Sequence, residues 1–229
     1  MSARLLVLRA EPGASETAAR ARGLGLDAVT APLFTVRPLA WQAPDAAEFD
    51  AILLTSANAT RHAGRQLRLF RHLPCFAVGE ATAAAAKEQG FADLRIGAAD
   101  GAATLATIAP GSRILHLCGR EHLRLNHPAL ERRIVYAADA AERMPAAAHA
   151  ALDRGALALV HSPRAASLFG ALVDAAGLHR AAIAIAAISP AAAAAAGPGW
   201  RSLSAAERPR DEALLELAAK LCKKAREAD

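Results

Sequence analysis

Two stretches of this 229-residue chain repeat the same order of apolar strand, small polar turn and alanine-rich helix, and each does so twice. The first stretch contains AILLTSANATRHAG (Ala51–Gly64) and then FAVGEATAAAAKEQGF (Phe76–Phe91). The second contains ALVHSPRAASLFG (Ala158–Gly170) and then IAAISPAAAAAAGPGW (Ile185–Trp200). A chain that repeats such units is expected to form two similar α/β lobes.

Within this repeat, Ser56 corresponds to Ser162 and Gly79 corresponds to Ser189. Each of them stands where a strand passes into a helix. The first backbone N–H groups of a helix have no partner within the helix, so anions bind there. The repeat therefore predicts two matched pairs of anion-binding turns that face one ligand. Helix capping alone is the competing interpretation of the serines, and it stays open at this point.

Strands and helices alternate with short connections, which predicts parallel sheets covered by helices on both faces. The expected fold class is α/β, with two lobes of the flavodoxin or Rossmann kind joined by a two-segment extended linker. Strands are expected at Leu5–Arg9, Asp27–Ala31, Ala51–Thr55, Pro74–Gly79, Arg113–Gly119, Arg133–Ala138, Ala156–Ser162 and Ala181–Ser189.

Helix positions follow from alanine content, capping residues and apolar spacing. They are expected at Glu16–Arg22 with Ser15 as N-cap, Ala59–Leu69, Ala81–Gln89, Glu121 to about Arg132, Ala165–Ala176, Ala191–Ala196, and Asp211–Arg226 with Asp211 as its cap.

The repeat boundaries place the seam between the lobes near residues 33–41 and 133–143. If both segments cross between the lobes, the first strand and helix belong with the C-terminal part of the chain. We therefore expect one discontinuous lobe of residues 1–34 and 142–229, and a second lobe of residues 42–132 inserted into it. Residues 35–41 and 133–141 are then the linkers.

The composition favours a cytoplasmic protein with acidic ligands. The formal net charge is +5, which favours anionic partners, but the basic residues are dispersed and no nucleic-acid-binding motif is present. No apolar run suits a membrane span, and the start of the chain resembles a β-strand more than a secretion signal. Cys75, Cys118 and Cys222 are odd in number and widely spaced, which indicates free thiols in a reducing compartment. A monomer is the default expectation.

Three weaker signals do not indicate a cofactor, a metal or a nucleophile. Gly23–Ala28 matches a loose dinucleotide-binding pattern, but it follows a helix, whereas that fingerprint follows a strand. Cys118, His122 and His127 lack the tight pairing of zinc ligands, so ordinary surface histidines are the better interpretation. Ser56 and Ser162 lie outside any nucleophile-elbow motif.

Polar and cationic residues follow the predicted strands at their carboxyl ends, where ligands bind in open α/β sheets. This rim suits a polyanionic ligand, although simple surface solvation is an equal alternative for Arg120. The residues concerned are Arg9, Thr55, Ser56, Gly79, Gly119, Arg120, Ser162 and Ser189.

Seven motifs in register along nearly the whole chain resemble the uroporphyrinogen-III synthase family. They are LRAEPGA, LLTSANA, FAVGEATAAAAKEQGF, LHLCGRE, the isolated IVY, LVHSPRAA and AISPAAAAAAG. The resemblance implies two α/β lobes with a cleft between them and no metal or cofactor. It implies hydroxymethylbilane, a linear tetrapyrrole with eight carboxylates, as substrate. The family closes this chain into uroporphyrinogen III, releasing water and inverting ring D through a spiro intermediate.

The resemblance also implies a set of site residues. Tyr136 matches the linker tyrosine of the family and is expected to assist departure of the substrate hydroxyl as a hydrogen-bond donor; packing at the lobe junction is the alternative. The expected substrate-binding residues are Arg9, Thr55, Ser56, Asn58, Gly79, Glu80, Thr82, Gly119, Arg120, Ser162, Arg164, Ser189 and Ala191.

The fourth turn departs from the family pattern. Ser189 replaces a glycine, Ala191 and Ala192 lack the usual hydroxyls, and Arg210 stands where a threonine is usual. This departure favours a second hypothesis, a non-catalytic two-lobed binding protein for an acidic small molecule. A sugar-phosphate or nucleotide enzyme is a third, which the lack of phosphate-binding motifs disfavours. The expected partners are hydroxymethylbilane and, transiently, the deaminase that makes it.

Overall fold

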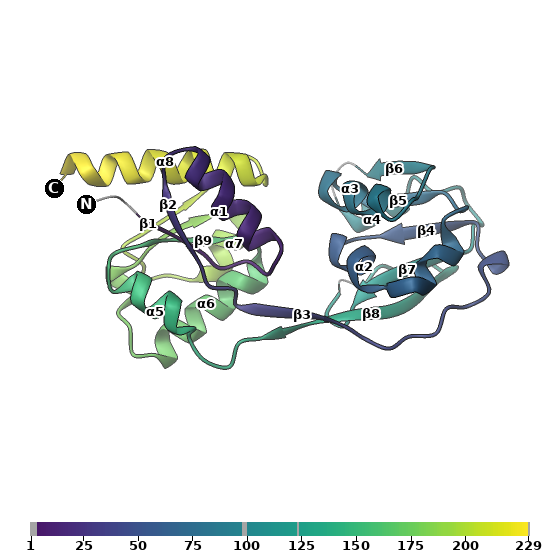
Figure 1. Cartoon of the computed structure of the whole chain (residues 1–229), viewed down its shortest axis with the longest axis horizontal. Helices are drawn as coiled ribbons and strands as arrows, with labels where there is room; N and C mark the ends of the chain where they lie inside the picture. The colour runs from purple at the N-terminus through teal and green to yellow at the C-terminus, as the bar shows by residue number, and fades with distance from the viewer. Residues whose placement is uncertain (1–3, 98–99, 123, 229) are drawn as a thin grey trace. The chain divides into compact units, whose positions relative to one another are not determined.

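The computed structural model describes residues 4–97, 100–122 and 124–228, which form two compact units (Figure 1). Unit 1 consists of Met1–Thr35 and Ala140–Asp229, and unit 2 of Val36–Asp139. The chain passes between them within β3 (Phe34–Pro38) and near the end of β8 (Leu130–Ala140). The domain and linker bounds expected from the sequence stay a prediction.

Unit 1 is built on a five-stranded parallel sheet in the order β11-β10-β9-β1-β2. The strands are β1 (Arg4–Val7), β2 (Asp27–Thr30), β9 (Leu157–Val160), β10 (Ala184–Ala187) and β11 (Ser202–Ala205). The helices are α1 (Gly13–Gly23), α5 (Ala146–Leu152), α6 (Pro163–Ala175), α7 (Pro190–Ala196) and α8 (Asp211–Ala228), with a 3-10 turn at Arg180–Ala182.

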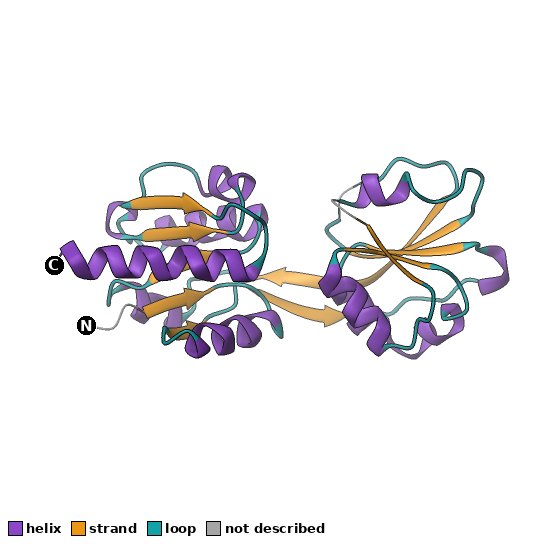
Figure 2. Ribbon diagram, turned by 90° about the horizontal axis from the view of Figure 1, so that it is seen from above, coloured by secondary structure: helices purple, strands orange, loops and turns teal. Residues whose placement is uncertain are grey.

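Side chains on successive residues of a strand point to opposite faces, so this sheet has a core on each side. Leu6 packs with residues of α5, α6 and α7, whereas Leu5 and Val7 pack with residues of α1 and α8. Figure 2 shows the strands of unit 1 between these helices. Burial on both faces explains why the central strands β9 and β10 are continuous apolar runs without polar alternation.

Unit 2 has a six-stranded sheet in the order β3-β8-β7-β4-β5-β6. Its other strands are β4 (Ala51–Leu54), β5 (Cys75–Val78), β6 (Leu94–Gly97) and β7 (Ile114–Gly119). These four and β8 are parallel, and β3 runs antiparallel to β8, since Leu39 N donates to Val135 O and Ala141 N donates to Leu33 O. The helices are α2 (Ala57–His62), α3 (Glu80–Glu88) and α4 (Gly101–Leu105), with 3-10 segments at Ala46–Glu48 and Gly64–Phe70.

The predicted fold class is confirmed: both units have parallel sheets flanked by helices. The three cysteines are free and buried. Burial raises the pKa of Cys75 to about 12 and that of Cys118 to about 11. Among the described residues, no helix is long and apolar enough to cross a membrane.

Three helix predictions are wrong. Glu121 to Arg132 is not helical in its described part, because Pro128 lies in its middle and disfavours helical backbone at the residue before it, and β8 already begins at Leu130. Ala59–Leu69 is divided, because Gly64 takes a φ of 70° after α2. Ser15 is not an N-cap: α1 begins at Gly13, and Ser15 N and Oγ both donate to the Glu11 carboxylate.

Candidate functional site

The four turns of the sequence repeat all become helix N-caps in the structure. Ser56 Oγ accepts from Asn58 N at 3.2 Å, Ser162 Oγ from Ala165 N at 3.1 Å, and Ser189 Oγ from Ala192 N at 3.2 Å. Gly79 caps α3 without a side chain, with a φ of 79° that glycine adopts at little cost. Capping is therefore one role of the serines. It leaves each hydroxyl hydrogen able to donate to a ligand.

In unit 1 the predicted site residues gather at the carboxyl edge of the sheet. Arg9 follows β1, Ser162 and Arg164 follow β9, and Ser189 and Ala191 follow β10. The Arg164 guanidinium lies 4.4 Å from the centre of the Phe34 ring, and its side chain is exposed. Ala191 is exposed and offers only backbone groups. This edge thus presents two guanidinium groups beside two serine-capped turns.

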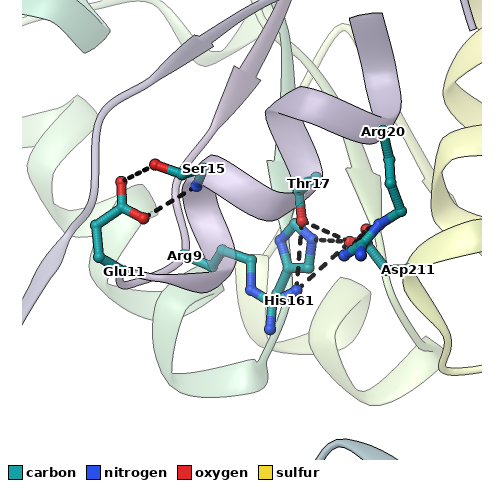
Figure 3. A network of polar contacts seen from close by, with 7 residues as sticks. All are labelled: Arg9, Glu11, Ser15, Thr17, Arg20, His161 and Asp211. Carbon is teal, nitrogen blue, oxygen red and sulfur yellow. Dashed lines mark hydrogen bonds and ion pairs between the residues drawn. The ribbon is translucent and has the colours of Figure 1, made fainter. Parts of the chain in front are cut away.

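Asp211, at the start of α8, joins Arg9 to a network that sequence reasoning missed (Figure 3). Its carboxylate accepts from Thr17 Oγ1 at 2.8 Å, Arg20 Nε at 2.8 Å and His161 Nε2 at 2.9 Å. Burial would raise the pKa of Asp211, but the hydrogen bonds from His161, Thr17 and Arg20 hold that pKa well below its usual value. The carboxylate is therefore ionised at neutral pH.

In unit 2, Tyr136 is positioned by Gly119 and a β-bulge. Cys118 pairs with Ile134 and Gly119 pairs with Tyr136, so β8 has one extra residue at this step. As a result Val135 and Tyr136, neighbours in sequence, both pack on the same core cluster. A β-carbon at Gly119 would lie 2.6 Å from Tyr136 Cζ and 2.9 Å from its Oη, so only glycine leaves room for the ring. The His62 ring centre is 6.3 Å from that of Tyr136.

The remaining predicted residues of unit 2 lie at the carboxyl ends of β4, β5 and β7, but they differ in what they can offer. Thr55 Oγ1 is 3.0 Å from Nε2 of His116. Asn58 donates its backbone N–H to Ser56. Glu80 is exposed, whereas Thr82 is only 5% exposed and faces the interior.

Arg120 is held by acidic side chains of unit 2. It donates to Glu121 at 2.8 Å and to Asp139 at 2.6 Å, and Asp139 also accepts from Arg37 at 2.5 Å. The hydrogen bonds from Arg37 and Arg120 hold the pKa of Asp139 below its usual value. This arrangement ties β3, β8 and the end of β7 together. A substrate carboxylate at Arg120 would share the guanidinium with these two acids.

The histidines near Cys118 make hydrogen bonds within the loop. His122 Nδ1 lies 2.9 Å from Gly119 O, and Ala129 N donates to His127 Nδ1. The His116 and His122 rings meet edge to face, with centres 6.2 Å apart. His116 is 1% exposed, and burial, with His122 and Arg132 nearby, lowers its pKa to about 4. Over residues 4–97, 100–122 and 124–228, no three His, Cys, Asp or Glu side chains are grouped to hold a metal ion.

Comparison with known proteins bears on the family and the fold of this chain. Residues 15–216 match the model of the family described as "Uroporphyrinogen-III synthase HemD". The fold is similar to uroporphyrinogen-III synthetase from Helicobacter pylori, with 16% identity, a TM-score of 0.63, and 95% of this chain and 99% of that chain covered. It is also similar to a mutant uroporphyrinogen III synthase from Thermus thermophilus, with 18% identity, a TM-score of 0.52, and 97% and 99% covered. No curated protein sequence matches. Since the family match spans most of its length, this chain belongs to the uroporphyrinogen-III synthase family.

Proposed function

We propose that this chain converts hydroxymethylbilane into uroporphyrinogen III, releasing water and inverting ring D through a spiro intermediate. Family membership gives the hydro-lyase activity and the substrate. The observation in the structure that carries the proposal is the repeated capped turn. Ser56, Gly79, Ser162 and Ser189 each cap a helix at the carboxyl end of a parallel strand.

Repeated turns of this kind suit a polycarboxylate. Backbone N–H groups at helix starts and serine hydroxyls can donate to carboxylate oxygens, and Arg9 and Arg164 add positive charge in unit 1. We assign Arg9, Thr55, Ser56, Asn58, Gly79, Glu80, Gly119, Arg120, Ser162, Arg164, Ser189 and Ala191 to substrate binding. Thr82 is buried, so we propose that it orients α3 and does not touch the substrate.

The chemistry needs positioning more than a strong acid or base. Loss of the hydroxyl leaves an azafulvenium stabilised by the pyrrole, and another pyrrole of the same substrate is the nucleophile. When the protein holds the bilane in position and shields it from water, the bilane can close at the substituted carbon of ring D instead of the unsubstituted one. In this proposal the Tyr136 phenol donates a hydrogen bond to the departing hydroxyl. Gly119 and the β-bulge hold the ring for this task.

The direct test is product analysis. Hydroxymethylbilane is made in situ from porphobilinogen and its deaminase, this protein is added, and the oxidised uroporphyrin isomers are separated by chromatography. Predominantly type III product is the expected result. Type I product at the rate of the protein-free control, from folded protein, would overturn the proposal. It would favour a binding protein for acidic molecules, to which the missing hydroxyls at Ala191 and Ala192 point.

We further propose that the protein acts in the cytoplasm as a monomer and receives the unstable bilane from the deaminase by transient contact. Three buried free thiols suit a reducing compartment. Light scattering tests the monomer. A type III yield that is maintained when an added viscogen slows the diffusion of free bilane would support the hand-over, and a yield that falls would contradict it. Disulfide-linked protein isolated from cells would contradict the cytoplasmic assignment.

A further inference from the structure

The Asp211 carboxylate connects four side chains from three elements of unit 1 (Figure 3). Thr17 and Arg20 come from α1, His161 follows β9, and Arg9 follows β1. Arg9 Nη1 lies 3.5 Å from Asp211 Oδ1, and the Asp211 side chain is only 9% exposed. A carboxylate with this little water around it needs these donors, so the network has a fixed geometry.

The link from Asp211 to Arg9 also runs through Thr17. Thr17 Oγ1 donates its one hydrogen to Asp211 at 2.8 Å, so it can only accept from Arg9 Nη1, which is 3.3 Å away. The Arg9 guanidinium lies across Gly13, where a β-carbon would be 2.5 Å from Nε and 2.8 Å from Nη2. Two acceptors on one side and a glycine on the other thus set the orientation of this guanidinium.

The contacts of Arg9 leave part of its donor capacity unused. Only Nη1 meets an acceptor among the described residues, so Nε and Nη2 retain hydrogens for a ligand. The side chain is 33% exposed, at the edge of the sheet where ligands bind. Glu11 is the acid nearby in sequence, and its carboxylate is occupied by Ser15.

The charges of the network favour an anion. Burial lowers the pKa of His161, so its ring is neutral at pH 7 and donates from Nε2 to Asp211. The charged members are therefore Arg9, Arg20 and Asp211, and one positive charge remains after the two signs are summed. Asp211 orients Arg9 without cancelling the charge of the whole network.

We propose that Asp211 is a positioning residue that, directly and through Thr17, holds the Arg9 guanidinium ready to bind one substrate carboxylate. This inference rests on the proposed function in so far as the ligand is a polycarboxylate. A purely structural Asp211 would only link α1, α8 and the end of β9. The two roles differ in whether the effect of Asp211 on binding requires Arg9.

A double-mutant cycle distinguishes these roles. We compare the wild type with Arg9→Gln, Asp211→Asn and the double variant, and measure KM and kcat for bilane and the affinity for uroporphyrin III, an octacarboxylate. Each single variant is expected to raise KM and Kd about five- to tenfold, in line with loss of one charge-assisted hydrogen bond, with kcat within about twofold. The double variant should match Arg9→Gln alone. The proposal is overturned if the rise in KM or Kd of the double variant equals the product of the two single rises. An unchanged KM in Asp211→Asn would overturn it as well.

Two further variants test whether misfolding explains the effect of Asp211→Asn. Thr17→Val removes the bridge but leaves the hydrogen bonds of Asp211 to Arg20 and His161, and it should raise KM in the same direction by a smaller factor. Asp27→Asn is the matched control, because it removes the ion pair with Arg4, 2.6 Å long, at the other end of β1. It should leave KM unchanged. If KM rises as much in Asp27→Asn as in Asp211→Asn, the proposal fails.

The affinity measurement separates this inference from the proposed function. If the wild type binds uroporphyrin III but makes no type III product, the proposed function fails and the same cycle in Kd still decides the role of Asp211. If the wild type neither makes type III product nor binds the octacarboxylate, both fail.

Discussion

Tyr136 is the residue whose chemical role is most directly testable. Tyr136→Phe removes the hydroxyl and keeps the ring that packs on Gly119. We expect kcat to fall about tenfold, the effect of losing a hydrogen bond of roughly 1–2 kcal/mol in the transition state, with little change in KM. Isomer-resolved kinetics measure this loss. Wild-type kcat in a variant with an unchanged thermal midpoint would leave Tyr136 a packing residue.

Gly119 offers a second test of the same position. In Gly119→Ala the new methyl group must displace the Tyr136 ring, so we expect a loss of kcat at least as large as in Tyr136→Phe. Gly119 is not one of the glycines with a positive φ, so the loss should not come from main-chain strain. Gly23→Ala is the matched control, because a β-carbon there meets no atom within 4 Å. Equal activity in both glycine variants would show that Tyr136 need not be held in place.

The lowered pKa of the buried His116 should make the stability of unit 2 depend on pH. Its folded pKa of about 4 lies below the unfolded value of 6.5, so between these values the unfolded chain binds a proton that the folded chain does not. The free energy of unfolding should therefore fall as pH drops from 6.5 to 4, by up to about 1.4 kcal/mol per unit from this group. Thr55, His122 and Arg132 are the polar groups around the ring.

Urea unfolding at pH 7.5, 5.5 and 4.5 measures this dependence in a Trp200→Phe background, where Trp41 is the remaining tryptophan and lies in unit 2. His116→Gln should be less stable at pH 7.5, but it should lose less stability on acidification. His149→Gln controls for histidine loss in general, because His149 lies in unit 1 and its side chain is half-exposed. Identical pH slopes in His116→Gln and the wild type would contradict the assignment.

At the scale of elements, the capped turns can be tested for a role beyond capping. Ser162 caps α6, and replacement by Ala should cost about 1 kcal/mol of stability, whereas Gly at an N-cap costs only a few tenths. Both variants remove the hydroxyl. If the hydroxyl also binds a substrate carboxylate, KM should rise by a similar factor in both, about three- to tenfold, although their stabilities differ. A KM that stays at the wild-type value in Ser162→Gly would restrict Ser162 to capping.

The sequence predicted those elements whose signals are local. An apolar run ending in Ser or Gly before alanines defines β4–α2, β5–α3, β9–α6 and β10–α7, because capping and helix propensity act over a few residues. It missed β6 and β11, edge strands with several exposed side chains and little apolar pattern, and the short helix α4. It also placed a helix at 121–132, where a proline-containing connection joins two adjacent parallel strands.

The same distinction between local and long-range signals applies to the residues of the candidate site. Ser162 and Ser189 could be found because their turns are local, whereas the partners of Arg9 could not. Thr17 and Asp211 are 194 positions apart, and no periodicity links them. One signal was present: His161 is a polar residue between a fully apolar strand and a capping serine, and its side chain is buried. The buried His116 has a similar signature inside the apolar run of β7.

At the scale of the whole molecule, each unit has what an independently folding domain requires. Unit 1 and unit 2 each bury apolar side chains on both faces of their own sheet. Unit 2 is continuous in sequence, and its first and last strands, β3 and β8, are hydrogen-bonded neighbours. A fragment with both strands complete, residues 34–140, therefore has adjacent ends and an intact sheet.

We expect the fragment 34–140 to fold alone and to unfold cooperatively, with a urea midpoint near that of unit 2 in the whole chain. The fragment 42–132, with the bounds expected from the sequence, is the decisive comparison. It lacks β3, most of β8, the core residue Val135 and Trp41, which packs against the same core. It also leaves the hydrogen-bonding edge of β7 without most of its partner. Uncovered sheet edge and lost apolar contacts should leave it unfolded or aggregated. If circular dichroism shows both fragments equally stable, β3 and β8 are linkers between domains; if only the longer one folds, they are structural strands of unit 2.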